Sequence, residues 1–239
     1  MGQRTAPYDA ASPLPQGAEK VAVVRDMFDS IAPRYDLVNR VITFSLDKGW
    51  RRRTVRSLDL GRGARVLDVA CGTGDLCREL RAAGAHPVGL DLSWGMLAHA
   101  RTIAPLVQGD GLRLPLPDAC LDGAVSGFAL RNVADLPGLL AELARVVRPG
   151  GRIALLEVAQ PENALLRLGH GAYFGHVVPR IGAVLSDGNA YRYLPRSVAY
   201  LPRPAAMLAM LAAAGWARPE RRALTGGVAQ LLTGTRAAP

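Results

Sequence analysis

The chain has 239 residues, of which 49% are hydrophobic and 21% charged, a composition typical of a globular protein and not of a disordered one. No apolar run reaches the ~18–20 residues of a membrane-spanning helix, so we expect a cytoplasmic protein. Lys and Arg number 29 against 20 Asp and Glu. This positive excess favours anionic partners: a nucleic acid, an anionic membrane surface or a phosphorylated ligand.

The first 60 residues predict a tail followed by helices. Residues 1–17 carry Pro and Gly without apolar periodicity, which predicts a flexible tail and no signal peptide. From residue 18 to 60, apolar residues recur at three- and four-residue spacing, as at Val21, Val24, Phe28 and Ile31. This spacing predicts an N-terminal helical cap.

From residue 61 to the C-terminus, strands alternate with helices of about ten residues. This alternation predicts an α/β fold with a doubly wound, mostly parallel sheet. The expected strands are 65–70, 87–91, 106–109, 122–130 and 152–158, and the expected helices are 75–83, 94–101 and 136–147.

The C-terminal third interrupts the alternation. Residues 163–185 have a helical pattern, and we interpret residues 160–203 as an insertion over the carboxyl edge of the sheet. A helix at 204–214 follows, and then two strand-like runs around Gly226 and Gly227 that predict an antiparallel edge hairpin.

The cysteines and histidines predict no metal site. Cys71, Cys77 and Cys120 form no C-x-x-C pair and are odd in number, so we expect thiols in a reducing compartment rather than a disulfide framework or zinc ligands. His170 and His176 are six residues apart, too far for the i, i+4 spacing of one helix face.

The turn after the first strand carries the chemistry. Gly72 and Gly74 let the backbone approach a ligand, and the next helix presents unpaired N–H groups there. Cys77 stands where the dinucleotide fingerprint has its third Gly, and Asp75 where a phosphate loop has Lys. An acid at a helix start repels a pyrophosphate and tolerates a cationic ligand.

Acids also follow the next two strands. Asp91 closes the second strand, where an acid accepts hydrogen bonds from ribose hydroxyls, and Asp110 follows the third, where it meets an adenine edge. With the glycine turn, these acids predict a pocket for adenosine bearing a positive sulfonium, which is S-adenosylmethionine (SAM).

Five segments carry more specific motifs. They are 27–36 (MFDSIAPRYD), 67–75 (LDVACGTGD), 130–133 (LRNV), 177–182 (VVPRIG) and 191–197 (YRYLPRS). In these segments the chain resembles the quinone-biosynthesis C-methyltransferases, the demethylmenaquinone and polyprenyl-benzoquinol methyltransferase family. The resemblance implies a class I fold with a seven-stranded Rossmann-like sheet, SAM as cofactor, and a demethylated isoprenoid quinol, first of all demethylmenaquinol, as methyl acceptor.

The motif and the resemblance together predict the cofactor site. The predicted cofactor-binding residues are Asp68, Gly72, Thr73, Gly74, Asp91, Met96, Asp110, Gly111 and Gly127. The chain departs from the family at Gly111, usually Ala, at Ala129, usually Gly, and at Val158-Ala159, usually Phe-Ser. These positions lie near the methyl-transfer site and bear on the choice of acceptor.

Carbon methylation needs an electron-rich ring, which loss of a ring hydroxyl proton provides. Arg131 follows the fourth strand at the carboxyl edge, so we predict that it stabilises the phenolate; a structural ion pair is its alternative. A guanidinium is a poor base, so the proton passes to water, His176 or a carboxylate. Asn132 either orients the ring or caps the next turn. The predicted substrate-binding residues are Tyr35, His176, Tyr191 and Tyr193.

An arginine run follows Trp50. Arg51, Arg52, Arg53 and Arg56 form either a solvated helix face or a contact with anionic head groups of the bilayer in which a polyprenyl quinol dissolves. The second interpretation predicts peripheral association with the inner face of the membrane. We expect no nucleic-acid partner, because no stacking platform or zinc pattern accompanies the charge. A homodimer is also compatible with the sequence.

Two other functions stay open at this stage. One is a related enzyme that methylates oxygen or carbon of a natural-product phenol or polyketide. The other is a SAM-binding assembly protein that has lost transfer activity.

Overall fold

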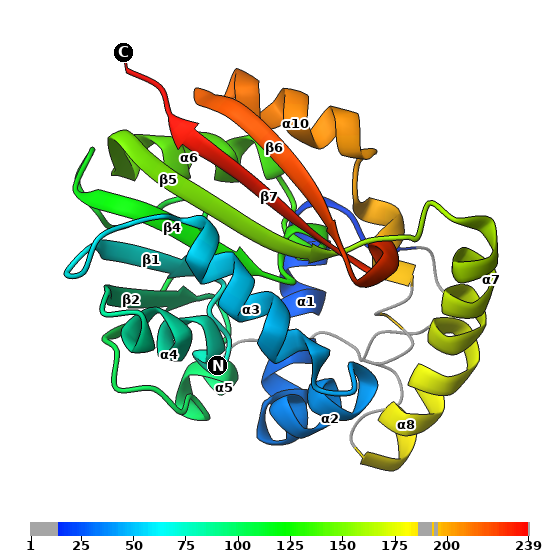
Figure 1. Ribbon diagram of the computed structural model, residues 1–239. Helices are drawn as coiled ribbons and strands as arrows, with labels where there is room; N and C mark the ends of the chain where they lie inside the picture. Colours follow the sequence, from blue (N-terminus) through cyan, green and yellow to red (C-terminus); the bar gives the residue numbers. More distant parts are fainter. Residues whose placement is uncertain (1–13, 186–192, 194–195, 239) are drawn as a thin grey trace.

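A computed structural model describes residues 14–185, 193 and 196–238, with side chains of 182–185 excepted (Figure 1). Its centre is one seven-stranded sheet in the order β3-β2-β1-β4-β5-β7-β6, in which β1 to β5 run parallel and β7 and β6 antiparallel to their neighbours. The doubly wound, mostly parallel sheet is confirmed. The strands are β1 (Arg65–Val69), β2 (His86–Asp91), β3 (Leu106–Gln108), β4 (Leu121–Gly127), β5 (Val147–Val158), β6 (Trp216–Leu224) and β7 (Ala229–Arg236).

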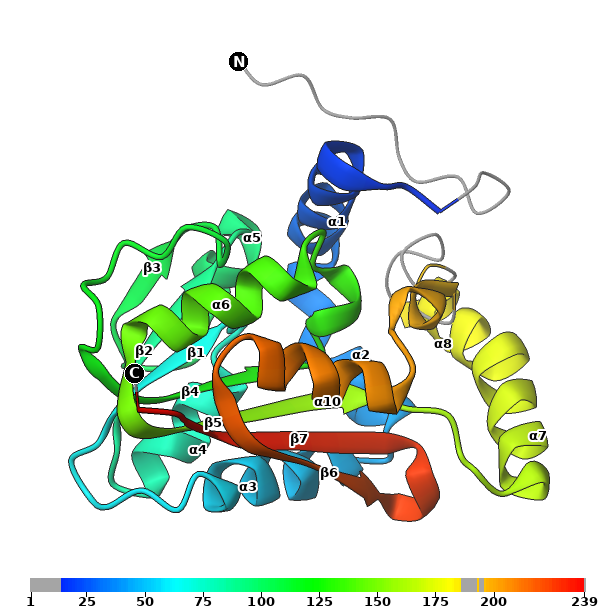
Figure 2. The same ribbon diagram turned by 90° about the horizontal axis from the view of Figure 1, so that it is seen from above.

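Helices cover both faces of the sheet. Figure 2 shows α6 and α10 on one face and α3 and α4 on the other. The helices are α1 (Gly17–Ile31), α2 (Tyr35–Ile42), α3 (Leu46–Ser57), α4 (Asp75–Ala82), α5 (Trp94–Ala98), α6 (Leu136–Val146), α7 (Ala164–Ala172), α8 (Val178–Leu185) and α10 (Pro204–Ala213). Within the described ranges, none of them has the length and hydrophobicity to cross a membrane.

Three boundaries differ from the sequence prediction by three residues or more. Strand β4 ends at Gly127 and not at residue 130, because Phe128 has a φ of +60° and Leu130 begins a 3-10 helix. Helix α5 ends at Ala98 and not at residue 101, because the chain turns back and the N–H of Arg101 donates to the carbonyl of Thr73 (3.0 Å). Strand β5 begins at Val147 and not at residue 152, because Val147 pairs with Leu121 before the strand continues. The C-terminal hairpin is present, with β6 outermost.

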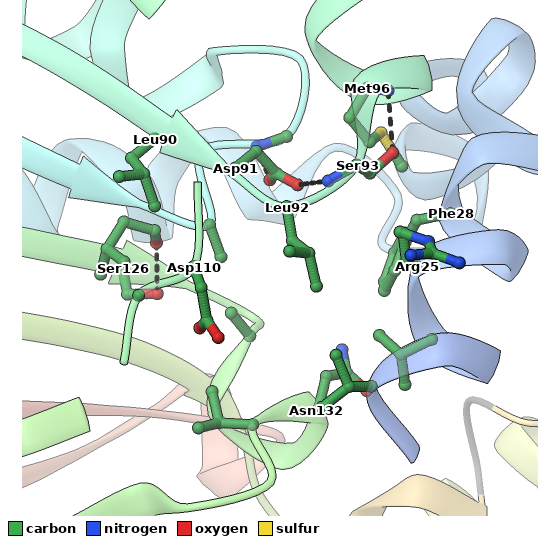
Figure 3. A pocket seen from close by; sticks show the side chains of 18 of the residues that line it. Arg25, Phe28, Leu90, Asp91, Leu92, Ser93, Met96, Asp110, Ser126 and Asn132 are labelled. Atoms are coloured by element: carbon green, nitrogen blue, oxygen red, sulfur yellow. Dashed lines mark hydrogen bonds between the residues drawn. The ribbon is translucent and has the colours of Figure 1, made fainter. Parts of the chain in front are cut away.

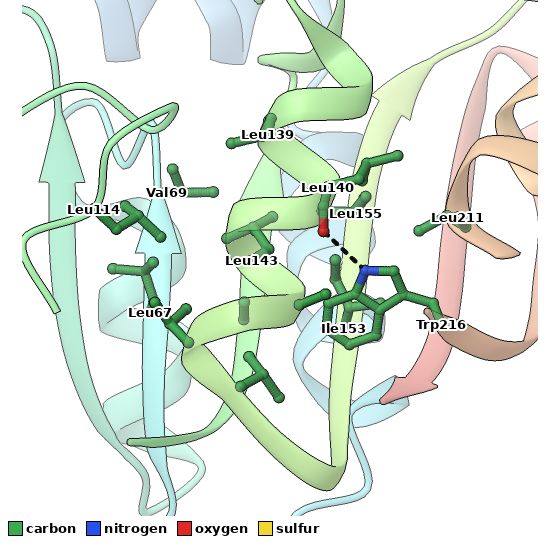
Figure 4. Packing of buried hydrophobic residues seen from close by; sticks show 14 of the residues in the cluster. Leu67, Val69, Leu114, Leu139, Leu140, Leu143, Ile153, Leu155, Leu211 and Trp216 are labelled. Carbon is green, nitrogen blue, oxygen red and sulfur yellow. Dashed lines mark hydrogen bonds between the residues drawn. The ribbon is translucent and has the colours of Figure 1, made fainter. Parts of the chain in front are cut away.

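The hydrophobic core has two layers, one on each face of the sheet. Along β5, Ile153 and Leu155 pack under α6 and α10, while Leu156 packs on the opposite face with residues of α3 and α4. A parallel strand buried on both faces is continuously apolar for this reason. Trp216 closes the first layer, and its indole N–H donates to the carbonyl of Leu140 (3.1 Å; Figure 4).

The N-terminal helices are joined to the rest by apolar packing and hydrogen bonds. Val24, Ile31 and Val38 share a cluster with Met96 and Val178. Residues 1–13 of the predicted tail lie outside the described residues, and the domain boundaries at 17, 60, 160 and 203 stay predictions.

Replacement of the buried indole tests the first core layer. We expect Trp216→Phe to lower the free energy of unfolding by about 1–3 kcal/mol, because it removes the hydrogen bond to Leu140 and leaves a void. Trp94→Phe is the matched control, since Trp94 is 63% exposed and its replacement is expected to be neutral. Urea unfolding measures both, and equal effects would contradict the assignment.

Candidate active site

The turn between β1 and α4 depends on Gly74. Its φ is +83°, and a Cβ atom there would lie 2.6 Å from Cγ2 of Thr102, so a larger residue is excluded. As the residue before α4, glycine has no side chain to cap the helix. The carboxylate of Asp68, inside β1, accepts the N–H of Cys77 in the first turn of α4 instead (3.1 Å). Asp68 and Gly74 shape the turn and line neither of the two cavities described below.

Thr73 and Asp75 connect this turn to the N-terminal helices. The hydroxyl of Thr73 is buried and donates to Asp36 of α2 (2.6 Å). Asp75 pairs with Arg51 of α3 (3.0 Å) and with Arg78. The charge of Asp75 is therefore balanced by two guanidinium groups, which weakens the sequence-based inference that this acid selects against a pyrophosphate by repulsion.

The other six predicted cofactor residues line one cavity at the carboxyl ends of β1, β2 and β4 (Figure 3). They are Gly72, Asp91, Met96, Asp110, Gly111 and Gly127. At Gly72 the φ is +55°, and a Cβ would have no atom within 4 Å, which leaves its backbone open to a ligand.

Two backbone hydrogen bonds hold Asp91 in this cavity. Its carboxylate accepts the N–H of Gly72 (2.7 Å) and of Ser93 (2.8 Å), while burial raises its pKa. Asp110, from the loop after β3, accepts the N–H of Leu112 (2.9 Å). Both carboxylates retain lone pairs for a further donor.

The lining fits the chemistry of SAM. Two carboxylates face a cavity whose walls include the apolar side chains of Leu92, Met96 and Leu112. We propose that Asp91 binds the ribose hydroxyls and that Asp110 lies by the adenine, between these apolar walls. Across the cavity, Arg25 and Phe28 of α1 complete the lining (Figure 3).

A second cavity of about 480 Å³ adjoins the first and shares Tyr35 and Phe128 with it. Phe128 follows β4 with a φ of +60°, a strained conformation of the kind that gathers at functional sites. Most of the lining is apolar or aromatic. These residues are Tyr35, Ile42, Phe44, Leu46, Trp50, Phe128, Val158, Leu165, Leu166, Tyr173, Phe174, Val198 and Val228.

Arg131 lines the second cavity and forms a buried ion pair. Its Nη1 lies 2.5 Å from Oε1 of Glu157, which is fully buried at the end of β5, and it also donates to the carbonyl of Phe128 (2.7 Å). The Nε atom is buried without a hydrogen-bond partner. The ion pair named as the alternative for Arg131 is therefore present, and it holds the guanidinium against the cavity.

Sequence reasoning assigned no role to Glu157. A charged residue within the apolar run of β5 was the available signal. A carboxylate buried in such a strand requires a charged or hydrogen-bonding partner, so the sequence could have predicted one for Glu157.

Asn132, predicted to be catalytic, and the predicted substrate residue Tyr35 line the cavities, whereas the predicted substrate residues Tyr193 and His176 do not. Tyr35 lines both cavities, and Asn132 lines the first. Tyr193 is fully buried outside both linings, and its hydroxyl lies 3.3 Å from Oδ1 of Asn132, so it contacts a lining residue rather than the cavity. Tyr191 lies outside the described residues.

His176 is exposed and lines neither cavity, so its position does not support the predicted substrate contact. His170, one helical region earlier, lines the second cavity instead. Its Nε2 is buried without a hydrogen-bond partner, and burial lowers its pKa, which favours the neutral imidazole near pH 7. Among the residues with described positions, no cluster of His, Cys, Asp or Glu could hold a metal ion.

A doubly wound sheet with a reversed β7, a glycine turn after β1 and acids after β2 and β3 defines a class I SAM-dependent methyltransferase. A SAM-dependent methyltransferase of Thermotoga maritima shares the fold, with a TM-score of 0.64 at 17% identity over 89% of this chain and 99% of that one.

The chain belongs to the ubiE/COQ5 methyltransferase family, whose sequence profile matches residues 16–236. It is 43% identical to the ubiquinone/menaquinone biosynthesis C-methyltransferase UbiE of Syntrophotalea carbinolica, covering 90% of this chain and 94% of that protein. It is 44% identical to a demethylmenaquinone methyltransferase of Deinococcus radiodurans, covering 94% and 97%. The resemblance seen in the sequence motifs is confirmed, and the chain is a SAM-dependent methyltransferase.

Removal of the Asp91 charge tests its proposed contact with the ribose. We expect Asp91→Asn to weaken SAM binding about ten- to a hundredfold, because hydrogen bonds to a charged acceptor contribute about 1.5–3 kcal/mol. Isothermal titration calorimetry measures the affinity. Asp118→Asn, at an exposed carboxylate outside the cavity, is the control and is expected to bind SAM as the unaltered chain does. An unchanged affinity in Asp91→Asn would exclude the ribose contact.

The buried Asp68 predicts a pH-dependent stability. Burial raises the pKa of Asp68 from 3.8 to about 7, so the folded chain holds a proton that the unfolded chain has already released over this range. Stability should fall as the pH rises from about 4 to about 7, by up to about 4 kcal/mol from this group, and then stay level. Asp68→Asn keeps an oxygen for the Cys77 N–H and should remove this slope in urea unfolding across the pH series. The same slope in both proteins would contradict the assignment.

Proposed function

We propose that this enzyme transfers a methyl group from SAM to a ring carbon of a demethylated isoprenoid quinol, with demethylmenaquinol as the first candidate. The observation that carries the proposal is the second cavity, which is apolar, adjoins the cofactor cavity and has the volume of a site for a bulky ligand. The relative named demethylmenaquinone methyltransferase supports the same acceptor.

The proposed chemistry assigns charge stabilisation to Arg131. Bound SAM supplies an electrophilic methyl group on its sulfonium. The permanent charge of Arg131 would stabilise the phenolate form of the quinol, whose ring is then nucleophilic at carbon. Glu157 would hold the guanidinium in place, because a buried carboxylate restricts the arginine to one geometry. Tyr35 and Phe128, which border both cavities, would position the ring towards the cofactor.

The hydroxyl proton needs an acceptor within the second cavity. Glu157 is occupied by Arg131, and His176 is exposed outside the cavity. His170 lines the cavity with an unpartnered Nε2, and its lowered pKa keeps this atom available to accept a proton. We therefore assign to His170, or to a water beside it, the role first considered for His176. Asn132, in contact with Tyr193, would orient the ring.

The proposed location is the cytoplasm, at the inner face of the membrane in which the quinol dissolves. The arginine run contributes less to this than its sequence suggested. Arg51 is buried between Asp47 and Asp75, and Arg52 lies 3.6 Å from Glu79, so only Arg53 and Arg56 remain as exposed members with no ion pair in the described chain. A homodimer likewise stays a proposal.

Transfer of a labelled methyl group tests the function directly. The protein is incubated with methyl-labelled SAM and a short-chain demethylmenaquinol, and mass spectrometry locates the label. We expect the label on a ring carbon. A label on oxygen would assign the chain to the phenol O-methyltransferases, and SAM binding without transfer to any quinol would assign it to the inactive assembly proteins.

A double substitution separates the catalytic from the structural role of Arg131. Arg131→Ala alone leaves Glu157 buried and unpaired, a loss of about 3–5 kcal/mol of stability. Arg131→Gln with Glu157→Gln removes both charges and retains polar partners, so it should remain folded. We expect this double variant to bind SAM normally by calorimetry and to lose at least about a hundredfold in kcat.

Glu157→Gln alone is the matched control, since it keeps the guanidinium and loses only its buried partner. We expect it to retain more activity than the double variant. A double variant with the turnover of the unaltered enzyme would show that Arg131 and Glu157 have a structural role only.

A further inference from the structure

Exposed apolar side chains gather on one part of the surface. Of the eleven large apolar side chains that are exposed among the described residues, eight lie on residues 37–46 and 165–177. We call these eight the mouth surface: Leu37, Val41, Phe44, Leu46, Leu165, Leu166, Leu168 and Val177. Contiguous apolar surface of this kind marks an interaction site in proteins more often than isolated exposed residues do.

The two segments lie side by side. The hydroxyl of Tyr173 donates to the carbonyl of Ile42 (2.9 Å), and the rings of Tyr173 and Phe44 are 5.8 Å apart. In Figure 1, α2, α7 and α8 accordingly lie at one end of the molecule. Residues from the N-terminal helices and from the predicted insertion therefore form one continuous surface.

The mouth surface is continuous with the lining of the second cavity at four residues. Phe44, Leu46, Leu165 and Leu166 are exposed to solvent and also line this cavity. These four side chains give an apolar connection between the surface and the cavity. Leu168, which is 74% exposed, and Leu37 lie in the same two segments but outside the cavity lining.

The exposed charges beside the mouth surface that have no ion pair among the described residues are positive. Lys48, Arg167 and Arg180 are exposed, and none of them forms an ion pair in the described part of the chain. Of the acids nearby, the buried Asp47 pairs with Arg51, and Glu162 before α7 pairs with Arg221. Asp36 is partly buried, and its carboxylate accepts a hydrogen bond from the buried Thr73. Such a surface complements an anionic bilayer, because the apolar side chains can enter the hydrocarbon while the cations bind the lipid phosphates.

We propose that the mouth surface docks on an anionic bilayer, so that the second cavity opens directly into the hydrocarbon. This inference rests on the proposed function, since it places the acceptor cavity against the phase in which a polyprenyl quinol dissolves. Docking spares the prenyl chain a passage through water, which is unfavourable for every exposed CH₂ group.

Vesicle sedimentation with the full chain tests the docking. We expect binding to phosphatidylcholine vesicles that contain phosphatidylglycerol, and weaker binding to phosphatidylcholine alone or at high salt. Leu168→Asp and Leu37→Asp, at residues outside the cavity lining, should each lower the partition coefficient at least about tenfold. Arg167→Glu should weaken binding only to the anionic vesicles.

Ile103→Asp is the matched control, because Ile103 is 81% exposed and lies outside the mouth surface. We expect it to bind vesicles as the unaltered chain does, and circular dichroism checks that all variants are folded. Absence of vesicle binding by the unaltered chain, or equal losses in Ile103→Asp and Leu168→Asp, would overturn the proposal. So would a dimer in analytical ultracentrifugation that Leu168→Asp dissociates without any vesicle binding, which would assign the surface to a second copy of the chain.

A methylation assay without vesicles separates this proposal from the proposed function. With a short-chain, dispersed demethylmenaquinol, Leu168→Asp should retain full activity. If the dispersed quinol is methylated and vesicles are not bound, the docking fails while the function stands. If vesicles are bound through the mouth surface and no quinol is methylated, the function fails and the surface remains a bilayer-binding one.

Discussion

The buried ion pair between Arg131 and Glu157 holds together the ends of β4 and β5, where the two cavities meet. Two charges removed from water must be paired closely, so the pair restricts the loop after β4 to one position. The same guanidinium binds the carbonyl of Phe128, whose side chain borders both cavities, and Asn132 follows directly. Lys20 of α1 donates to the carbonyl of Val133 (2.8 Å), which ties the N-terminal helices to this loop.

The cofactor turn combines residues that can meet a ligand with residues that support them. Gly72 and Asp91 face the cavity and are joined by a hydrogen bond, while Asp68 binds the first turn of α4 from behind. Thr73 binds α2 through Asp36. A motif identified in the sequence therefore contains two kinds of residue, and only the three-dimensional arrangement separates them.

An ion pair of Arg51 connects the glycine turn after β1 with the second cavity. Arg51 reaches from the second cavity to Asp75 at the start of α4, and on its other side it pairs with Asp47. A residue that the sequence placed among head-group contacts thus joins the two parts of the site. The surface that we propose to dock on a bilayer lies instead mainly on α2 and α7, which are more than 120 residues apart in the sequence.

The sequence alone determined the alternation of strands and helices, the glycine turn, the acids after β2 and β3, and the family, because each of these is encoded in neighbouring residues or in a regular spacing. Most of the cofactor cavity follows from them, since parallel strands bring their carboxyl ends to one edge. Only the tertiary structure decided that Glu157 pairs with Arg131, that His170 and not His176 lines the second cavity, and that Arg51 is buried. These outcomes depend on contacts between residues far apart in the chain and on how each helix is rotated against its neighbours, and local sequence encodes neither.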